Sequence, residues 1–153
     1  AREKAGAVRA RLLGETSPLE HRPWVVAADT IVLIEGEVLG KPRDDADAAR
    51  MLGRLSGRTH RVLTALCLLD VGSERSAQRS MNSEVRFREL DRPTIDAYVK
   101  SGEGRDKAGS YAIQGLGAGL VREIAGSYTN VVGLPAAETV DMLLDAGVLK
   151  VWP

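Results

Sequence analysis

The sequence predicts a single domain that mixes helices and strands, of the α/β or α+β class. Two observations support this prediction. The chain has 153 residues and 44% of them are apolar, which is enough for one sizeable core. Segments with the alternating pattern of strands are interspersed with segments that start at a capping residue and stop at a glycine, as helices do.

The N-terminal third predicts a helix, a loop and a hairpin. The helix covers residues 1–13 and has Ala5, Val8 and Leu12 on its apolar face. Glycine, serine and proline among charged residues then predict a loop. A short apolar strand follows and ends at Asp29. The next apolar run reaches a Glu-Gly pair that turns the chain back on itself, which indicates a hairpin.

The middle of the chain predicts a capped helix and a long strand. Asp44, with Asp47 three residues later, is typical of a helix start, and Gly57 ends that helix. Residues 59–71 predict a strand that is buried in its second half. Residues 72–80 are polar and predict a mobile loop.

The last third predicts two strands and two helices. Residues 81–90 alternate between apolar and charged side chains, as a half-exposed strand does. Asp91 opens a helix that Gly102 closes. The remaining predicted elements are a strand over residues 120–124 and a helix over residues 136–146.

Composition excludes several classes of protein. Lys and Arg total 21 and Asp and Glu also total 21, so no overall basic field attracts nucleic acid, and six aromatic residues leave little for base stacking. The single cysteine, Cys67, excludes an internal disulfide framework and a cysteine-built zinc site, and it fits a reducing compartment. The longest apolar run, residues 62–70, is too short to span a membrane.

Three clusters contain residues suited to chemistry. Asp29 at a strand end is placed for metal binding or base chemistry, or it caps a turn. Lys41, held between Gly40 and a proline, offers an ammonium to a phosphate, or it is a solvated loop residue. In a glycine-rich run, Lys107 offers a charge and Gln114 an amide to a ligand. This run matches neither the Walker nor the Rossmann pattern.

The histidines and the cysteine predict no site of their own, and His60 is predicted to be a structural or a surface residue rather than a metal ligand. His60 has no second histidine or cysteine at metal-ligand spacing, and His21 is predicted to be exposed in a loop. Cys67 lies within an apolar run and is predicted to be a small core residue. No hydrolase triad is recognisable.

Three separated motifs resemble the Maf family of nucleotide pyrophosphatases, also called septum formation inhibitors. The resemblance is carried by the run VVAADTIVLIEGEVLGKPRDDADAARMLGRLSGRTHRVLTAL, then DKAGSYAIQGLG, then SYTNVVGLP. The opening AREKA resembles the helix that precedes the ADT strand in that family. The resemblance covers nearly the whole chain, residues 1–153, which we therefore expect to be one Maf-like domain.

The resemblance implies a fold, a reaction and partners. The family fold is α/β and similar to that of inosine triphosphatases, with two lobes of mixed sheet and helices around a central cleft. The implied reaction is metal-dependent hydrolysis of a nucleoside triphosphate to the monophosphate and pyrophosphate, with Mg or Mn as the divalent metal. We expect a cytoplasmic homodimer that binds neither nucleic acid nor membrane.

The resemblance also implies roles for six residues. Asp29 matches the family's proton acceptor and is the candidate metal ligand. Three phosphate-facing lysines are matched by Lys4, Lys41 and Lys107. Thr30 and Gln114 match the positions that sort the family by base, and this pair resembles the branch that acts on dTTP and UTP.

One feature departs from the family pattern. In the family, a strand, a Gly/Ser-rich turn and an S-x-S-P-R-R motif precede the helix that AREKA resembles, whereas the sequence here opens with AREKA. We therefore expect an N-terminally incomplete domain that is weakly active or inactive when taken alone. The alternative function is a regulatory nucleotide-binding protein of cell division, with little or no turnover.

Overall fold

The computed structural model describes residues 1–14, 23–73 and 75–152. The helices are α1 (Arg2–Gly14), α2 (Asp45–Leu55), α3 (Arg92–Ser101), α4 (Tyr128–Val132) and α5 (Ala136–Asp145), with short 3₁₀ turns η1 (Ala108–Ser110) and η2 (Gly115–Leu120). The strands are β1 (Trp24–Ile34), β2 (Glu37–Leu39), β3 (Thr59–Asp70), β4 (Ser76–Phe87) and β5 (Val121–Ala125). The predicted mixture of helices and strands is confirmed.

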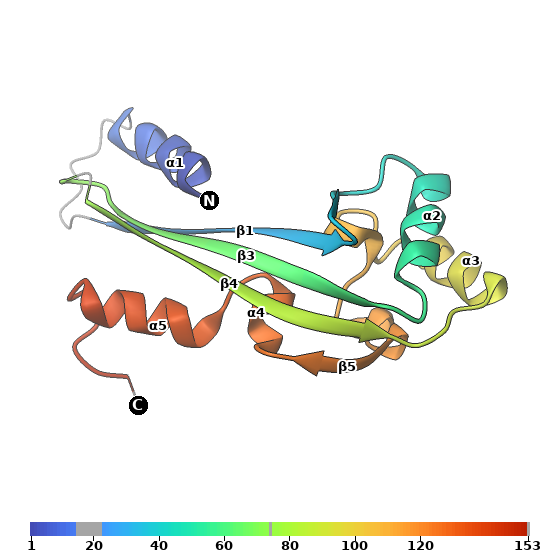
Figure 1. Cartoon of the computed structure of the whole chain (residues 1–153). Coiled ribbons are helices and arrows are strands. Elements are labelled where there is room, and N and C mark those ends of the chain that lie inside the picture. The colour runs from blue at the N-terminus through green and yellow to red at the C-terminus, as the bar shows by residue number, and fades with distance from the viewer. Residues whose placement is uncertain (15–22, 74, 153) are drawn as a thin grey trace.

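The described strands form one five-stranded sheet in the order β2-β1-β3-β4-β5, and each pairing in it is antiparallel. The predicted hairpin joins β1 to β2. Glu35 and Gly36 both have positive φ, 50° and 83°, which is the backbone twist that a two-residue hairpin turn requires. The long strands β1, β3 and β4 run side by side across the molecule (Figure 1).

Local capping rules set the starts of α2 and α3 as predicted. The Asp44 carboxylate accepts a hydrogen bond of 2.7 Å from the backbone N–H of Asp47, and Asp91 accepts one of 3.0 Å from Thr94. Gly102 ends α3 in the left-handed conformation, with φ 76°.

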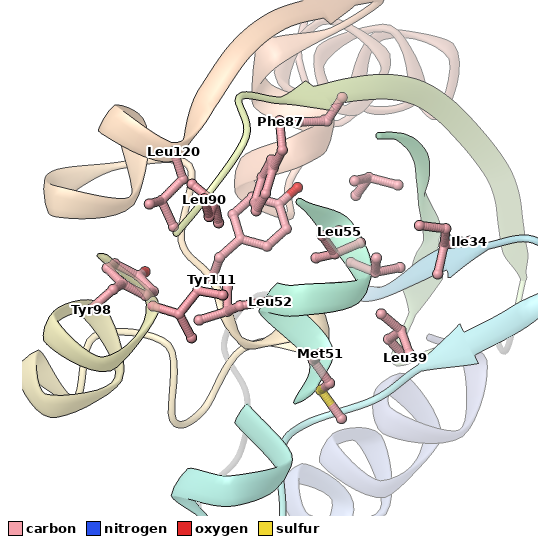
Figure 2. Packing of buried hydrophobic residues seen from close by; sticks show 14 residues of the cluster. Ile34, Leu39, Met51, Leu52, Leu55, Phe87, Leu90, Tyr98, Tyr111 and Leu120 are labelled. Carbon is pink, nitrogen blue, oxygen red and sulfur yellow. The ribbon is translucent and has the colours of Figure 1, made fainter. Parts of the chain in front are cut away.

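The apolar core has three clusters along the sheet. The largest packs α2 and α3 against one end of the sheet and includes Leu52, Leu55 and Phe87 (Figure 2). Near the other end, α1 and α5 lie on opposite faces (Figure 1). Because side chains alternate along β3, Cys67 packs in the α1 cluster and Leu66 in the α5 cluster. This double burial explains the unbroken apolar run in β3.

Three sequence predictions are wrong. Val8 is 47% exposed, because α1 buries only a narrow stripe around Ala5. Residues 76–80 belong to β4, because their backbone pairs with β3 although their side chains are exposed. Asp29 does not end a strand: β1 continues to Ile34 because the backbone of β3 pairs with it on both sides of the carboxylate.

No helix within the described ranges is long and apolar enough to cross a bilayer.

Candidate active site

The six residues to which the family resemblance assigns roles line one cavity of about 420 Å³. The cavity lies between the start of α1, the middle of β1, the turn after β2, the segment around η1 and the end of α4. The six residues in its lining are Lys4, Asp29, Thr30, Lys41, Lys107 and Gln114. The fold therefore brings together side chains from four separate stretches of the chain.

Asp29 is one of the two carboxylates in this lining. Its Oδ1 accepts a hydrogen bond from the Nζ of Lys4 on α1, and 47% of its side chain is exposed. That hydrogen bond, followed by the positive charges of Lys4 and Lys41, holds the pKa of Asp29 below its usual range. Asp29 is thus a charged carboxylate at neutral pH, within reach of a ligand.

Asp29 and Thr30 leave β1 on opposite faces, because successive side chains of a strand alternate. The cavity reaches both faces, since Lys4 of α1 and Val132 of α4 also line it. Lys4, which bonds to Asp29, is thereby separated from the surroundings of Thr30, which include α4. A ligand with one charged and one uncharged end matches this arrangement.

Lys41 and Lys107 are placed by a contact between their two loops. The backbone carbonyl of Gly40 accepts a hydrogen bond of 3.0 Å from the N–H of Gly109. Gly109 has φ 71°, and a Cβ there would lie 3.1 Å from Val32, so glycine permits this close approach to β1. The two ammonium groups therefore belong to one connected surface.

Asp106 is a second carboxylate of the cavity. Both of its oxygens accept hydrogen bonds of 2.8 Å from the Nζ of Lys107. This bond, helped by the charge of Lys41, lowers the pKa of Asp106. The cavity thus holds three lysines against two aspartates, and an anionic ligand competes with Asp29 and Asp106 for the ammonium groups.

Glu103 organises the glycine-rich segment, a role that sequence reasoning missed. Its carboxylate accepts backbone hydrogen bonds of 2.9 Å from Leu116 and 2.7 Å from Gly117, and a third of 2.8 Å from the hydroxyl of Tyr98. The two backbone bonds fix the chain just after Gln114, and the third ties Glu103 to α3. An acid embedded among glycines was the available signal, because free backbone N–H groups need an acceptor.

Asn130 is the other missed residue. It is fully buried, and its side chain donates to the carbonyl of Val62 and the hydroxyl of Ser83. Its backbone carbonyl accepts from Thr64, which in turn contacts Thr30. The SYTN motif contained it, but nothing in the sequence indicated which distant groups it meets.

The lining of the cavity fits a divalent metal whose coordination is completed by a bound ligand. The described residues include no cluster of three or more His, Cys, Asp or Glu that holds a metal by itself. Magnesium is commonly bound by one or two carboxylates together with substrate phosphates and water. Asp29, half exposed and charged, suits that mode of binding.

The structural roles predicted for two other residues are confirmed. His60 is buried and lies 2.8 Å from the Tyr111 hydroxyl, measured from its Nε2. Cys67 is a buried free thiol. His21 lies outside the described residues.

Comparison with known proteins decides the family. The model of the Maf-like protein family matches residues 1–146. The chain belongs to the Maf-like protein family. The resemblance that the three motifs carry is confirmed over nearly the full chain.

Similar Maf-like proteins carry the name dTTP/UTP pyrophosphatase. The chain is 50% identical to one from Desulfotalea psychrophila over 128 residues, which cover 84% of this chain and 66% of the relative. It is 52% identical to one from Shewanella oneidensis over 128 residues, covering 84% and 65%. It is 47% identical to one from Syntrophomonas wolfei over 147 residues, covering 96% and 74%. The chain thus spans about two thirds of the length of the first two relatives.

Proposed function

We propose that this protein hydrolyses dTTP and UTP to the nucleoside monophosphate and pyrophosphate. The names of its relatives support the substrates. The observation that carries the proposal is one cavity that is lined by Lys4, Lys41 and Lys107 together with the charged Asp29. Such a group of ammoniums beside a carboxylate suits phosphoanhydride hydrolysis, which needs charge neutralisation and a positioned water.

The lysines bind the triphosphate. Each ammonium is a compact charge that pairs with phosphate oxygens, and Lys4 and Lys107 exchange their aspartate partners for these oxygens when the nucleotide binds. The lysines then also stabilise the negative charge that develops on pyrophosphate as the bond between the α-phosphorus and the bridging oxygen breaks.

Asp29 positions the attacking water. In the free protein its pKa is lowered, so the carboxylate is charged before the nucleotide binds, and it can then accept a hydrogen bond or a proton from a water that faces the α-phosphorus. Asp29 is also the residue that would hold Mg or Mn. Such a metal, when bound, supplies additional positive charge to the phosphates.

Thr30 and Gln114 contact the base. Uracil and thymine present carbonyl acceptors on either side of an N–H donor, and the Gln114 amide offers both a donor and an acceptor. The homodimer and the cytoplasmic location stay predictions of the family resemblance.

The experiment measures pyrophosphate release from dTTP, UTP, CTP and ATP by the full-length protein with Mg present. We expect dTTP and UTP to be preferred, and Asp29→Asn to lower kcat about 100-fold or more while nucleotide still binds. Asp96→Asn is the matched control, since Asp96 pairs with Arg92 on α3 and is not part of the cavity lining. Nucleotide binding without turnover in the unaltered protein would instead support the regulatory alternative.

A further inference from the structure

A chain of hydrogen bonds links Thr30 to the buried interior. Thr30 and Thr64 face each other across β1 and β3, and their hydroxyl oxygens lie 2.9 Å apart. The Thr64 hydroxyl also lies 3.0 Å from the backbone carbonyl of Asn130, and both Thr64 and Asn130 are fully buried.

The direction of these bonds follows from counting protons. The carbonyl of Asn130 can only accept, so Thr64 gives it the single proton of its hydroxyl. Thr64 then has only lone pairs to offer Thr30, and the proton between the two threonines must come from Thr30. In the reverse order, lone pairs of Thr64 and Asn130 would face each other at 3.0 Å.

The position of the Asn130 carbonyl is fixed by the rest of that residue. Both protons of its amide nitrogen are used, in bonds of 3.0 Å to the carbonyl of Val62 and 2.9 Å to the hydroxyl of Ser83. Its backbone N–H donates to Ser127, and its carbonyl also accepts from the N–H of Gly133. The direction of the whole chain of bonds is therefore set by Asn130 and its partners, and not by Thr30.

We propose that Thr64 and Asn130 are positioning residues that hold the Thr30 hydroxyl as a pure acceptor, so that the cavity selects pyrimidines with an N–H at ring position 3. This inference rests on the proposed function. Uracil and thymine carry that proton, whereas cytosine has a lone pair there. Gln114 alone does not discriminate, because its amide can turn over and exchange donor with acceptor.

The test compares kcat/KM for UTP and CTP in Thr64→Val and Thr64→Ser variants. Valine keeps the branched shape but leaves the Thr30 proton without its acceptor, so that Thr30 can rotate and donate to cytosine. We expect the UTP to CTP ratio to fall about tenfold, the value of roughly one hydrogen bond, mainly through KM. Serine retains the oxygen, and the Thr64→Ser variant retains the ratio.

Each result decides the inference. A merely structural role lowers kcat/KM for UTP and for CTP alike. An unchanged UTP to CTP ratio in Thr64→Val therefore overturns the inference. UTP hydrolysis by the unaltered protein still supports the proposed function in that case. Equal use of UTP and CTP by the unaltered protein also overturns it. If Thr64→Val does not fold, Thr64→Ala serves in its place, and if nothing is hydrolysed, dissociation constants for UTP and CTP give the ratio. A protein that neither binds nor hydrolyses UTP overturns both proposals.

Discussion

His60 shows how burial alone sets the charge of a side chain. The imidazole is 2% exposed and packs edge-on against the rings of Phe87 and Tyr111. This burial lowers the pKa of His60 to about 4, because the apolar surroundings disfavour the charged ring. At neutral pH the residue is therefore a neutral part of the core.

The lowered pKa of His60 predicts a loss of stability in mild acid. The unfolded chain binds a proton near pH 6.5 and the folded chain only near pH 4, so the folded state is fully favoured above pH 6.5 and loses stability as the pH falls toward 4. The free energy of unfolding should fall by about 3 kcal/mol at most over that range. Urea titrations from pH 7 to pH 4 measure the loss.

Direct observation of the ring provides the control for this prediction. The ring-proton NMR resonance of His60, assigned by its disappearance in His60→Gln, should not titrate above about pH 5. A His60 resonance that titrates near pH 6.5 in the folded protein contradicts the prediction.

At the scale of the element, the segment over residues 102–119 owes its path to close backbone contacts. A Cβ at Gly104 would lie 2.1 Å from the carbonyl oxygen of Ser110, which precedes the cavity residue Tyr111. Gly53, in the middle of α2, would meet nothing within 4 Å. The two glycines therefore form a matched pair, one required by packing and one not.

Gly104→Ala should move the loop that holds Lys107 and weaken nucleotide binding. We expect a destabilisation of about 2 kcal/mol, because a backbone atom must shift to make room, and an affinity for UTP at least tenfold lower. Gly53→Ala should instead stabilise the protein by about 1 kcal/mol through helix propensity, with unchanged affinity. Urea unfolding and calorimetric titration with UTP measure both effects, and similar results for the two variants would be evidence against the packing argument.

At the scale of the whole molecule, the sheet connects clusters that lie near its two ends. The α1 cluster encloses Cys67, which is fully buried between Val25, Leu69 and Ala5 of the helix. Lys4, one residue before Ala5, bonds to Asp29 in the cavity. Packing of α1 on the sheet and assembly of the cavity are therefore coupled.

The reactivity of Cys67 should report this packing. Because the thiol is buried, we expect it to react with a maleimide at least about 100-fold more slowly in the native protein than in guanidinium. Saturating UTP should slow the native reaction further, since the nucleotide engages Lys4 and holds α1 in place. Fast labelling of the native protein would show that α1 leaves the sheet readily.

Features that depend on neighbours within a few residues were predictable from the sequence. The caps at Asp44 and Asp91 and the turn at Glu35 are contacts of this kind, and the apolar run around Cys67 marked a buried strand. The family motifs also identified six residues that the structure places around one cavity. Their chemical roles stay predictions.

Which groups the polar residues contact depends on how the fold arranges distant segments of the chain. Asp29 lies within β1 because β3 pairs with its backbone on both sides, and its partner Lys4 comes from a helix 25 residues earlier. Asn130 reaches Thr64 from a segment 66 residues away. Local pattern records hydrophobicity and capping, whereas the partner of a hydroxyl, amide or carboxylate is set by which distant backbone the fold brings within hydrogen-bonding distance.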